Sequence, residues 1–423
     1  MNRSASNLTT VRQPSGGKGL QRPQQQLGFT LIELLISMAM GLGVLVAMAS
    51  VYVAAKQTFK FQETGGRMQE DANFALESIV RNMRMAGFGG CPGVDYVTVP
   101  EARWFPNSGV SPTAITDSNP LATLFSTDPA ITQQPLTPSN FFRGWDAVPS
   151  AMFASGAVPS GSNGSALYFA GGSADVVNVS AAMTVHDDPL TIAADPFNWR
   201  NTTTNSGLYT FIVSDCSNSS LFYGKVNSAG TSITHSTAFG NAAANFKKNA
   251  ALDATGPIYD HKTAGGAVVM PLEWNLYYVA TRTGAATPSL YRVRHDGNDR
   301  KNAEEVITNV ESLRVHYGEN TKGKVSGGVT DCDLATGGAT CFPTLQPDVW
   351  RTAATGVVSW NNVMAVRIGL MMVSDDSTVA GDIVKSTPTL LGLSYTLPTG
   401  ASTARLRKEF STTVSVRNRM PTR

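Results

Sequence analysis

An uncharged run of 22 residues, 34–55, constrains this chain more than any other feature of its sequence. As an α-helix the run would be about 33 Å long, enough to cross the apolar core of a lipid bilayer. The segment before it, residues 1–28, has no acidic residue and four basic ones, Arg3, Arg12, Lys18 and Arg22. Because basic flanks stay on the cytoplasmic side, everything after Lys56 is expected to be exported.

Glu33 does not suit a plain membrane anchor. It lies near the start of the apolar stretch that begins at Phe29, where an unpaired carboxylate costs several kcal/mol. Cleavage between Gly28 and Phe29 would create an ammonium one helical turn from Glu33, on the same chain or on a neighbouring one. In a low-dielectric setting that pairing would be strong.

Residues 28–35, GFTLIELL, resemble the class III signal of type IV prepilins and pseudopilins. The resemblance implies that prepilin peptidase cuts between Gly28 and Phe29 and methylates the new amino group of Phe29. It also implies that Glu33 docks the subunit into a growing filament. Two alternatives are a secretory signal cut after Ala47-Met48-Ala49 and a permanent single-pass anchor.

The helical pattern continues through residues 57–90 but becomes amphipathic. Apolar residues recur every three or four positions and predict one buried face. They are Ala72, Leu76, Ile79 and Met83. The helix should end near Ala86, where the glycine-rich segment AGFGGCPG begins. We therefore expect one long helix with a transmembrane first half, residues 29–56, and a second half that packs on protein.

The remainder, residues 91–423, is predicted to be a β-rich globular domain. Residues 92–160 hold ten of the 22 prolines and are expected to form a loop-rich insertion. Eight later stretches rich in β-branched and aromatic residues predict strands: 166–170, 208–214, 221–226, 276–280, 290–294, 313–317, 364–373 and 410–416. With the long helix they indicate an α+β fold that has an antiparallel sheet and large loops.

Several segments resemble a narrower group, the type IV pilus assembly protein W (PilW) family of large minor pilins. The likeness spans Gly28 to Arg419 and rests on Gly90-Cys91, LYTFIVSDCSNSSLFYGKV, LYRVRHDG, VITNVESLRVHYGEN, VMAVRIGLMMVS and FSTTVSVRNR. It implies the pilin arrangement, in which the amphipathic half of the helix packs on the sheet. It also implies a non-enzymatic subunit of a tip complex that primes pilus assembly.

The resemblance further implies partners and a location. The implied partners are prepilin peptidase, other minor pilins, the major pilin and a large tip adhesin, with inner-membrane lipid around the helix before assembly. The globular domain would lie in the periplasm of a bacterium and later at the pilus tip. A minor pseudopilin of type II secretion shares the plan, and an exported hydrolase or adhesin with an ordinary signal peptide is a further alternative.

Four cysteines in an exported domain are expected to form two disulfides, for which three pairings exist. Cys332 and Cys341 flank a short glycine-containing loop that closes at modest entropic cost. That pairing leaves Cys91, at the end of the helix, to meet Cys216 on a strand. The second bridge would tie the helix to the sheet.

The sequence predicts no metal, cofactor or catalytic centre. It has no CxxC pair, and its five histidines show no metal-binding spacing. Residues 318–325 have P-loop spacing, but Val325 replaces the Ser or Thr that would hold magnesium. No GxSxG elbow occurs.

Two basic clusters raise the question of a nucleic acid partner. They are Arg292, Arg294, Arg300 and Lys301, and Arg405, Arg407, Lys408, Arg417, Arg419 and Arg423. The net charge is only +2, from 33 basic and 31 acidic residues, so no overall field attracts a polyanion. We expect these arginines to form solvated ion pairs with nearby acidic residues. The alternative is a DNA-binding patch, in which Tyr291 or Trp274 would stack on bases.

Overall fold

The structure of the protein is a computed structural model. It describes residues 30–90, 103–104, 142–148, 162–185, 188–200, 208–215, 219–236, 259, 266–297, 303–325, 331–333, 341–343, 346–354, 356–357, 360–375, 388–398 and 404–416. The chain divides into two compact units, Met1–Phe59 and Lys60–Arg423. Helix α1, Leu31–Met83, contributes residues to both units.

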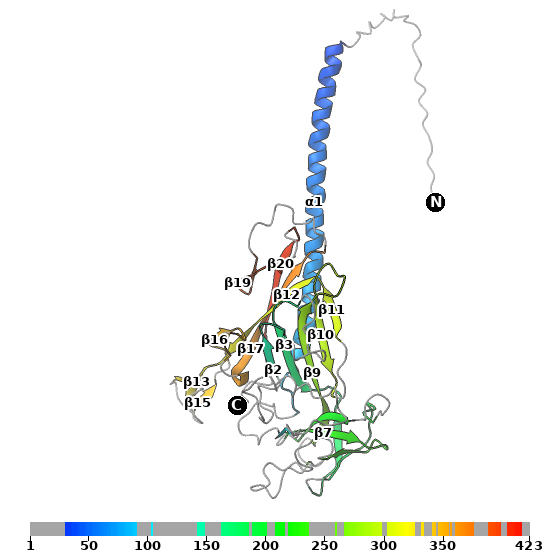
Figure 1. Ribbon diagram of the computed structural model, residues 1–423, viewed down its shortest axis with the longest axis vertical. Coiled ribbons are helices and arrows are strands. Elements are labelled where there is room, and N and C mark those ends of the chain that lie inside the picture. Colours follow the sequence, from blue (N-terminus) through cyan, green and yellow to red (C-terminus); the bar gives the residue numbers. More distant parts are fainter. Residues whose placement is uncertain are drawn as a thin grey trace, which may run out of the picture. The chain divides into compact units, whose positions relative to one another are not determined.

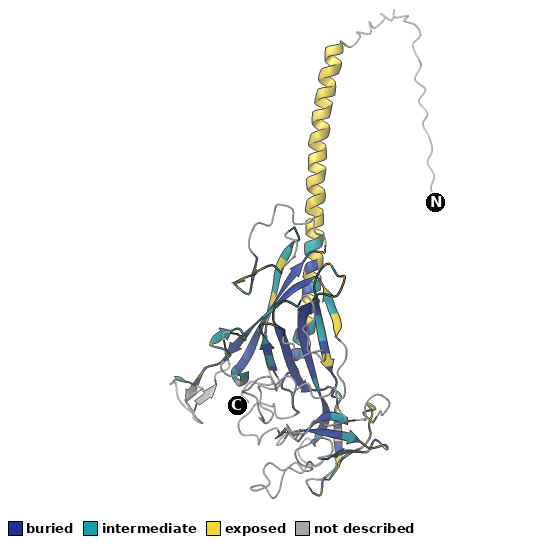
Figure 2. Cartoon of the chain, viewed as in Figure 1, coloured by how far each residue is buried: buried dark blue, intermediate teal, exposed yellow. Residues whose placement is uncertain are grey.

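In the first unit, residues 31–59 of α1 form an apolar helix whose side chains are exposed (Figure 2). Leu31 and Leu45, for example, are 78% and 62% exposed. Among the described residues, α1 is the one helix long and apolar enough to cross a membrane. An exposed apolar surface of this extent is stable only in lipid or against other protein.

In the second unit, the remaining part of α1 packs on β-sheets through one face (Figure 1). All four residues of the predicted apolar stripe are buried, from Ala72 to Met83. Met68 and Ala75 extend the same face. The predicted amphipathic half of the helix is therefore confirmed, and its burial supplies the hydrophobic stabilisation that fixes it to the sheets.

The larger sheet has eleven strands within the described part of the chain. They are β1 (Arg103–Trp104), β2 (Phe142–Trp145), β3 (Ala166–Gly172), β4 (Val177–Ala181), β5 (Leu190–Ile192), β6 (Leu208–Ser214), β7 (Ser219–Val226), β8 (Ser232–His235), β9 (Val268–Ala280), β10 (Ser289–His295) and β11 (Glu304–Thr308). Neighbouring strands pair antiparallel, except that β1 is parallel to β7.

Strand β9 connects two parts of this sheet (Figure 1). Its first residues pair with β4 and β6, beside a core cluster that includes Trp199, Phe211 and Phe222. Its later residues pair with β3 and β10. Tyr277 and Val279 of this later part join the core that contains α1.

A second sheet has the strand order β16 (Val349–Arg351), β12 (Val310–Glu319), β17 (Val363–Val373) and β20 (Arg407–Ser415). The 3₁₀ helix η4, Trp360–Asn362, precedes β17. Smaller sheets join β14 (Asp331–Asp333), β13 (Lys322–Val325) and β15 (Cys341–Pro343), and β18 (Thr389–Leu390) with β19 (Leu393–Ser394). The architecture is α+β, as predicted, and every one of the eight predicted strands is present.

The helix ends at Met83, three residues earlier than predicted. The amides of Met85 and Ala86 donate to carbonyls three residues back, Asn82 and Met83, so the last turn tightens into 3₁₀ geometry. Gly87 then adopts a left-handed conformation with φ 72°, which glycine accepts without strain.

The predicted loop-rich insertion, residues 92–160, contains two strands that the sequence did not indicate, β1 and β2. Strand β2 pairs antiparallel with β3, with Phe142 opposite Phe169. The ring of Phe142 is fully buried and lies 6.0 Å from that of Tyr317 on the second sheet. This segment is therefore part of the core.

Candidate functional site

Glu33 lies in the first turn of α1, inside the apolar unit. Its backbone amide donates a hydrogen bond to the carbonyl oxygen of Thr30 at 3.0 Å, and its backbone carbonyl accepts one from the hydroxyl of Ser37 at 2.7 Å. A carboxylate in the first turn is favoured by the positive end of the helix dipole. Gly28 and Phe29, the predicted processing positions, lie outside the described residues.

Tyr277 links the second half of α1 to the sheet by polar contacts. Its hydroxyl accepts the side-chain amide of Asn82 at 2.6 Å and lies 3.4 Å from the hydroxyl of Ser78. The ring is buried and stacked on Phe169, with centroids 5.8 Å apart. Because these contacts are directional, they fix the rotation and the height of the helix on the sheet.

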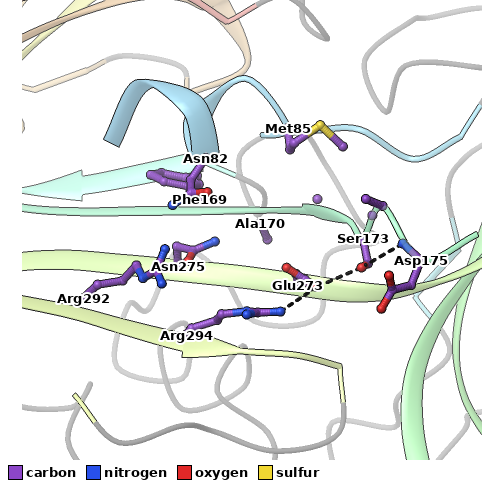
Figure 3. A pocket seen from close by; sticks show the side chains of 13 residues that line it. Asn82, Met85, Phe169, Ala170, Ser173, Asp175, Glu273, Asn275, Arg292 and Arg294 are labelled. Atoms are coloured by element: carbon purple, nitrogen blue, oxygen red, sulfur yellow. Dashed lines mark hydrogen bonds and ion pairs between the residues drawn. The ribbon is translucent and has the colours of Figure 1, made fainter. Parts of the chain in front are cut away.

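A pocket of about 360 Å³ lies where the end of α1 meets the ends of β3 and β10 and the middle of β9 (Figure 3). The strand register places Asn275 opposite Phe169 on one side and Arg294 on the other. Glu273, two residues earlier, is opposite Gly171 and points to the same face of the sheet. Asn82 and Met85 supply the helix side of the pocket.

The arginines of this pocket are already paired. Arg294 contacts Glu273 at 3.1 Å, and Arg292 forms a short ion pair with Glu304 of β11. The Ser173 hydroxyl also donates to Glu273, at 2.8 Å. The expectation that these two arginines form ion pairs is confirmed.

Two polar groups of the pocket have no partner within the described part of the chain. The side-chain oxygen of Asn275 is buried and accepts no hydrogen bond. The carboxylate of Asp175 makes no ion pair and accepts no hydrogen bond, although its backbone amide donates to Ser173. Glu273 and Asn275, two apart in an apolar strand, were the sequence signal for this polar face, and sequence reasoning missed it.

Arg407 in the second basic cluster is paired, but not in solvent as predicted. It forms a bidentate ion pair with Glu311, at 2.6 and 2.8 Å, and both side chains are almost fully buried. Arg407 lies on β20 and Glu311 on β12, so the pair reaches over β17. Burial and the charge of Glu311 raise the pKa of the adjoining Tyr395, which therefore stays protonated and hydrogen-bonded to Asn163.

Cys332 is disulfide-bonded. It lies on β14 and Cys341 on β15, which flank β13 on opposite sides. The side chain of Cys341, like Cys91 and Cys216, lies outside the described residues. The pairings Cys332–Cys341 and Cys91–Cys216 therefore stay predictions.

The described residues contain no group of three or more His, Cys, Asp or Glu side chains that could hold a metal ion. His316, for example, lies opposite Arg367 in the sheet. Burial, followed by the charges of Arg314 and Arg367, lowers its pKa, while the charge of Asp146 acts in the opposite direction; the ring is therefore neutral at pH 7.

Comparison with known proteins relates the C-terminal part of the chain to one family. Residues 276–418, about a third of the chain, match Type IV Pilus-assembly protein W, and this segment includes the whole four-stranded sheet. A solved Type IV-like pilin from Thermus thermophilus is 17% identical in sequence to this chain. The match covers 35% of this chain and 69% of the pilin, with a TM-score of 0.17. A score that low establishes no structural correspondence. No curated protein matches the sequence.

Proposed function

We propose that this chain, a PilW-like type IV pilin, is a minor pilin that helps to prime pilus assembly within a tip complex. The match of residues 276–418 to Type IV Pilus-assembly protein W carries the proposal. The apolar N-terminal helix supports it, because the same surface that suits lipid also suits the helices of other subunits. The chain would act by assembling and would catalyse no reaction.

The proposed mechanism begins with the leader. Prepilin peptidase would cut between Gly28 and Phe29 and methylate the new amino group, leaving the apolar helix in the inner membrane and the second unit in the periplasm. During assembly the helix would exchange lipid for the helices of neighbouring pilins. Glu33 would set the register of that exchange, since burying it away from a Phe29 ammonium leaves a charge unpaired.

Two measurements test this proposal. Mass spectrometry of the mature chain should find N-methylated Phe29 at its N-terminus; an N-terminus near Ser50 would instead indicate an ordinary signal peptide. A Glu33→Val variant should be processed normally, yet its incorporation into pili should fall by a factor of about ten or more.

Glu77→Val is the matched control for Glu33→Val. Glu77 lies on the same helix and forms an exposed ion pair with Arg81 at 3.1 Å, which contributes little. Its loss should leave incorporation within about twofold of wild type. Equal incorporation of Glu33→Val and wild type would contradict the proposed role of Glu33.

Deletion of the gene separates the pilus function from type II secretion. Loss of a pilus-priming subunit should remove surface pili and leave protein secretion intact. A secretion pseudopilin would give the reverse result. Other minor pilins, the major pilin and a large tip adhesin are the proposed partners, and their co-purification with the chain from sheared pili would identify the complex.

The proposed disulfides would hold the periplasmic unit in its assembled form. Cys91–Cys216 would tie the segment after α1 to the strand region that follows β6, and Cys332–Cys341 would close the loop between β14 and β15. Peptide mapping of the unreduced protein should recover these two linkages. A different linkage of Cys332 would replace this assignment.

A further inference from the structure

We propose that the pocket at the end of α1 receives a lysine side chain from another polypeptide. Three side chains with acceptor oxygens, Asp175, Glu273 and Asn275, follow one another along the pocket (Figure 3). They come from the segment after β3 and from β9, so the second unit alone builds the site. The class of ligand follows from the positive charge and the hydrogen-bond donor that these side chains lack among the described residues.

The first observation is a missing positive charge. Arg294 and Arg292 are matched by Glu273 and Glu304, so each cation in the wall already has a carboxylate. The carboxylate of Asp175 has no such partner among the residues that the structure describes. One cation therefore completes the electrostatics of the pocket, whereas an anionic ligand would have to displace an existing ion pair.

The second observation is a missing hydrogen-bond donor. Asn275 is only 8% exposed, and its side-chain oxygen accepts no hydrogen bond within the described chain. Buried polar atoms in folded proteins are nearly always hydrogen-bonded. Because β9 is paired on both sides here, with Phe169 and Arg294 as neighbours, this side chain is held on the pocket face. A ligand that carries N–H groups would satisfy it.

An ammonium fits these acceptors better than a guanidinium. Glu273 uses one carboxylate oxygen, Oε1, for both Ser173 and Arg294, and no residue that the structure describes donates to Oε2. The open acceptors thus come from three separate side chains, and the three diverging N–H groups of an ammonium suit that arrangement. A guanidinium is best matched by the edge of a single carboxylate. Met85 and Phe169 add apolar surface for the methylene stem of a lysine.

The inference rests on the proposed function in one respect, that the chain works inside a multi-protein assembly. It predicts that a lysine of a neighbouring polypeptide reaches Asp175 when that assembly forms. The neighbour is defined here only by this basic side chain at its contact surface.

Zero-length carbodiimide cross-linking of piliated cells that carry the full chain tests the inference directly. The reagent joins a carboxylate to an amine only where they are in contact, so peptide mass spectrometry should find an amide bond between Asp175 or Glu273 and a lysine of another polypeptide. Asp175→Asn removes one reactive carboxylate and one charge partner of the lysine, so the yield of the remaining adduct at Glu273 should fall by about tenfold or more. Asn275→Leu, which keeps the volume and removes the acceptor, should lower it as well.

Asp188→Asn provides the control, because Asp188 is an exposed aspartate outside this pocket whose carboxylate accepts backbone amides. Its adduct yield should stay within about twofold of wild type. Absence of an intermolecular adduct at Asp175 and Glu273 in cells with normal pili would overturn the inference and leave the proposed function standing. Loss of the adduct together with a mature N-terminus other than Phe29 would instead reject the proposed function.

Discussion

At the scale of single residues, the buried ion pair of Arg407 and Glu311 makes a sharp stability prediction. Their side chains are 4% and 3% exposed, so removing one partner leaves the other as a buried charge with neither a counter-ion nor water around it. Arg407→Met should therefore cost about 3–5 kcal/mol of unfolding free energy. Urea unfolding of the purified protein in detergent, followed by tryptophan fluorescence, measures the loss.

The double variant Arg407→Met, Glu311→Met is the control for that experiment. It removes both charges and fills the space with apolar groups, so most of the lost stability should return. A double variant as unstable as the single one would show that packing, and not the unpaired carboxylate, causes the loss. The pair also marks a limit of sequence reasoning. The two residues are 96 positions apart, and only the strand order β12-β17-β20 brings them together.

At the scale of elements, the approach of the end of α1 to β3 depends on Gly171. A Cβ at this position would lie 2.0 Å from the backbone carbonyl oxygen of Met85, which cannot rotate away. Two hydrogen bonds hold the segments together: Gly87 donates to Ala170, and Gly172 donates to Phe88. Gly171→Ala should therefore push the end of the helix away from the strand and lower the free energy of unfolding by about 1–3 kcal/mol. A thermal unfolding experiment would show this loss as a lower midpoint temperature.

Gly66→Ala is the matched substitution on the same helix. Nothing lies within 4 Å of its added methyl group, and alanine favours the helix over glycine by about 1 kcal/mol. The thermal midpoint of this variant should be unchanged or higher. If both alanine variants behaved alike, the close contact at Gly171 would not matter for stability.

Elements with a local pattern could be predicted, and elements defined by their neighbours could not. The stripe from Ala72 to Met83 repeats with the helical period, so the sequence alone shows which face is buried. Strand β2 has only four residues, FRGW, within a proline-rich stretch. What makes it a strand is its pairing with β3, in which Trp145 lies opposite Ala166. No periodicity within four residues could signal that.

The same distinction holds for the whole molecule. The apolar run is contiguous in the sequence, so a helix able to cross a membrane could be predicted from the order of residues alone. The pocket could not, because Asp175 and Asn275 are far apart in the chain and meet only through the register of β3 with β9. A site of this kind forms when the sheet is assembled.

The division of the chain near Lys60 predicts how it can be cut. The second unit contains every helix residue that packs in the core, from Met68 to Met83. A fragment of residues 60–423, exported by a secretory signal, should therefore fold, remain soluble without detergent and unfold cooperatively. It should not enter membranes, because the exposed apolar side chains from Leu31 to Phe59 are gone.

A shorter fragment that begins at Gly87 makes the comparison decisive. It lacks the helix face, so Tyr277, Val315 and Ile368 of the sheets lose the apolar cover that keeps them buried. Uncovered sheet faces of this kind associate, so this fragment should aggregate or bind a hydrophobic dye strongly. Size-exclusion chromatography separates the outcomes. A soluble monomer from residue 87, or an aggregate from residue 60, would mean that the helix stabilises the domain differently from the packing described above.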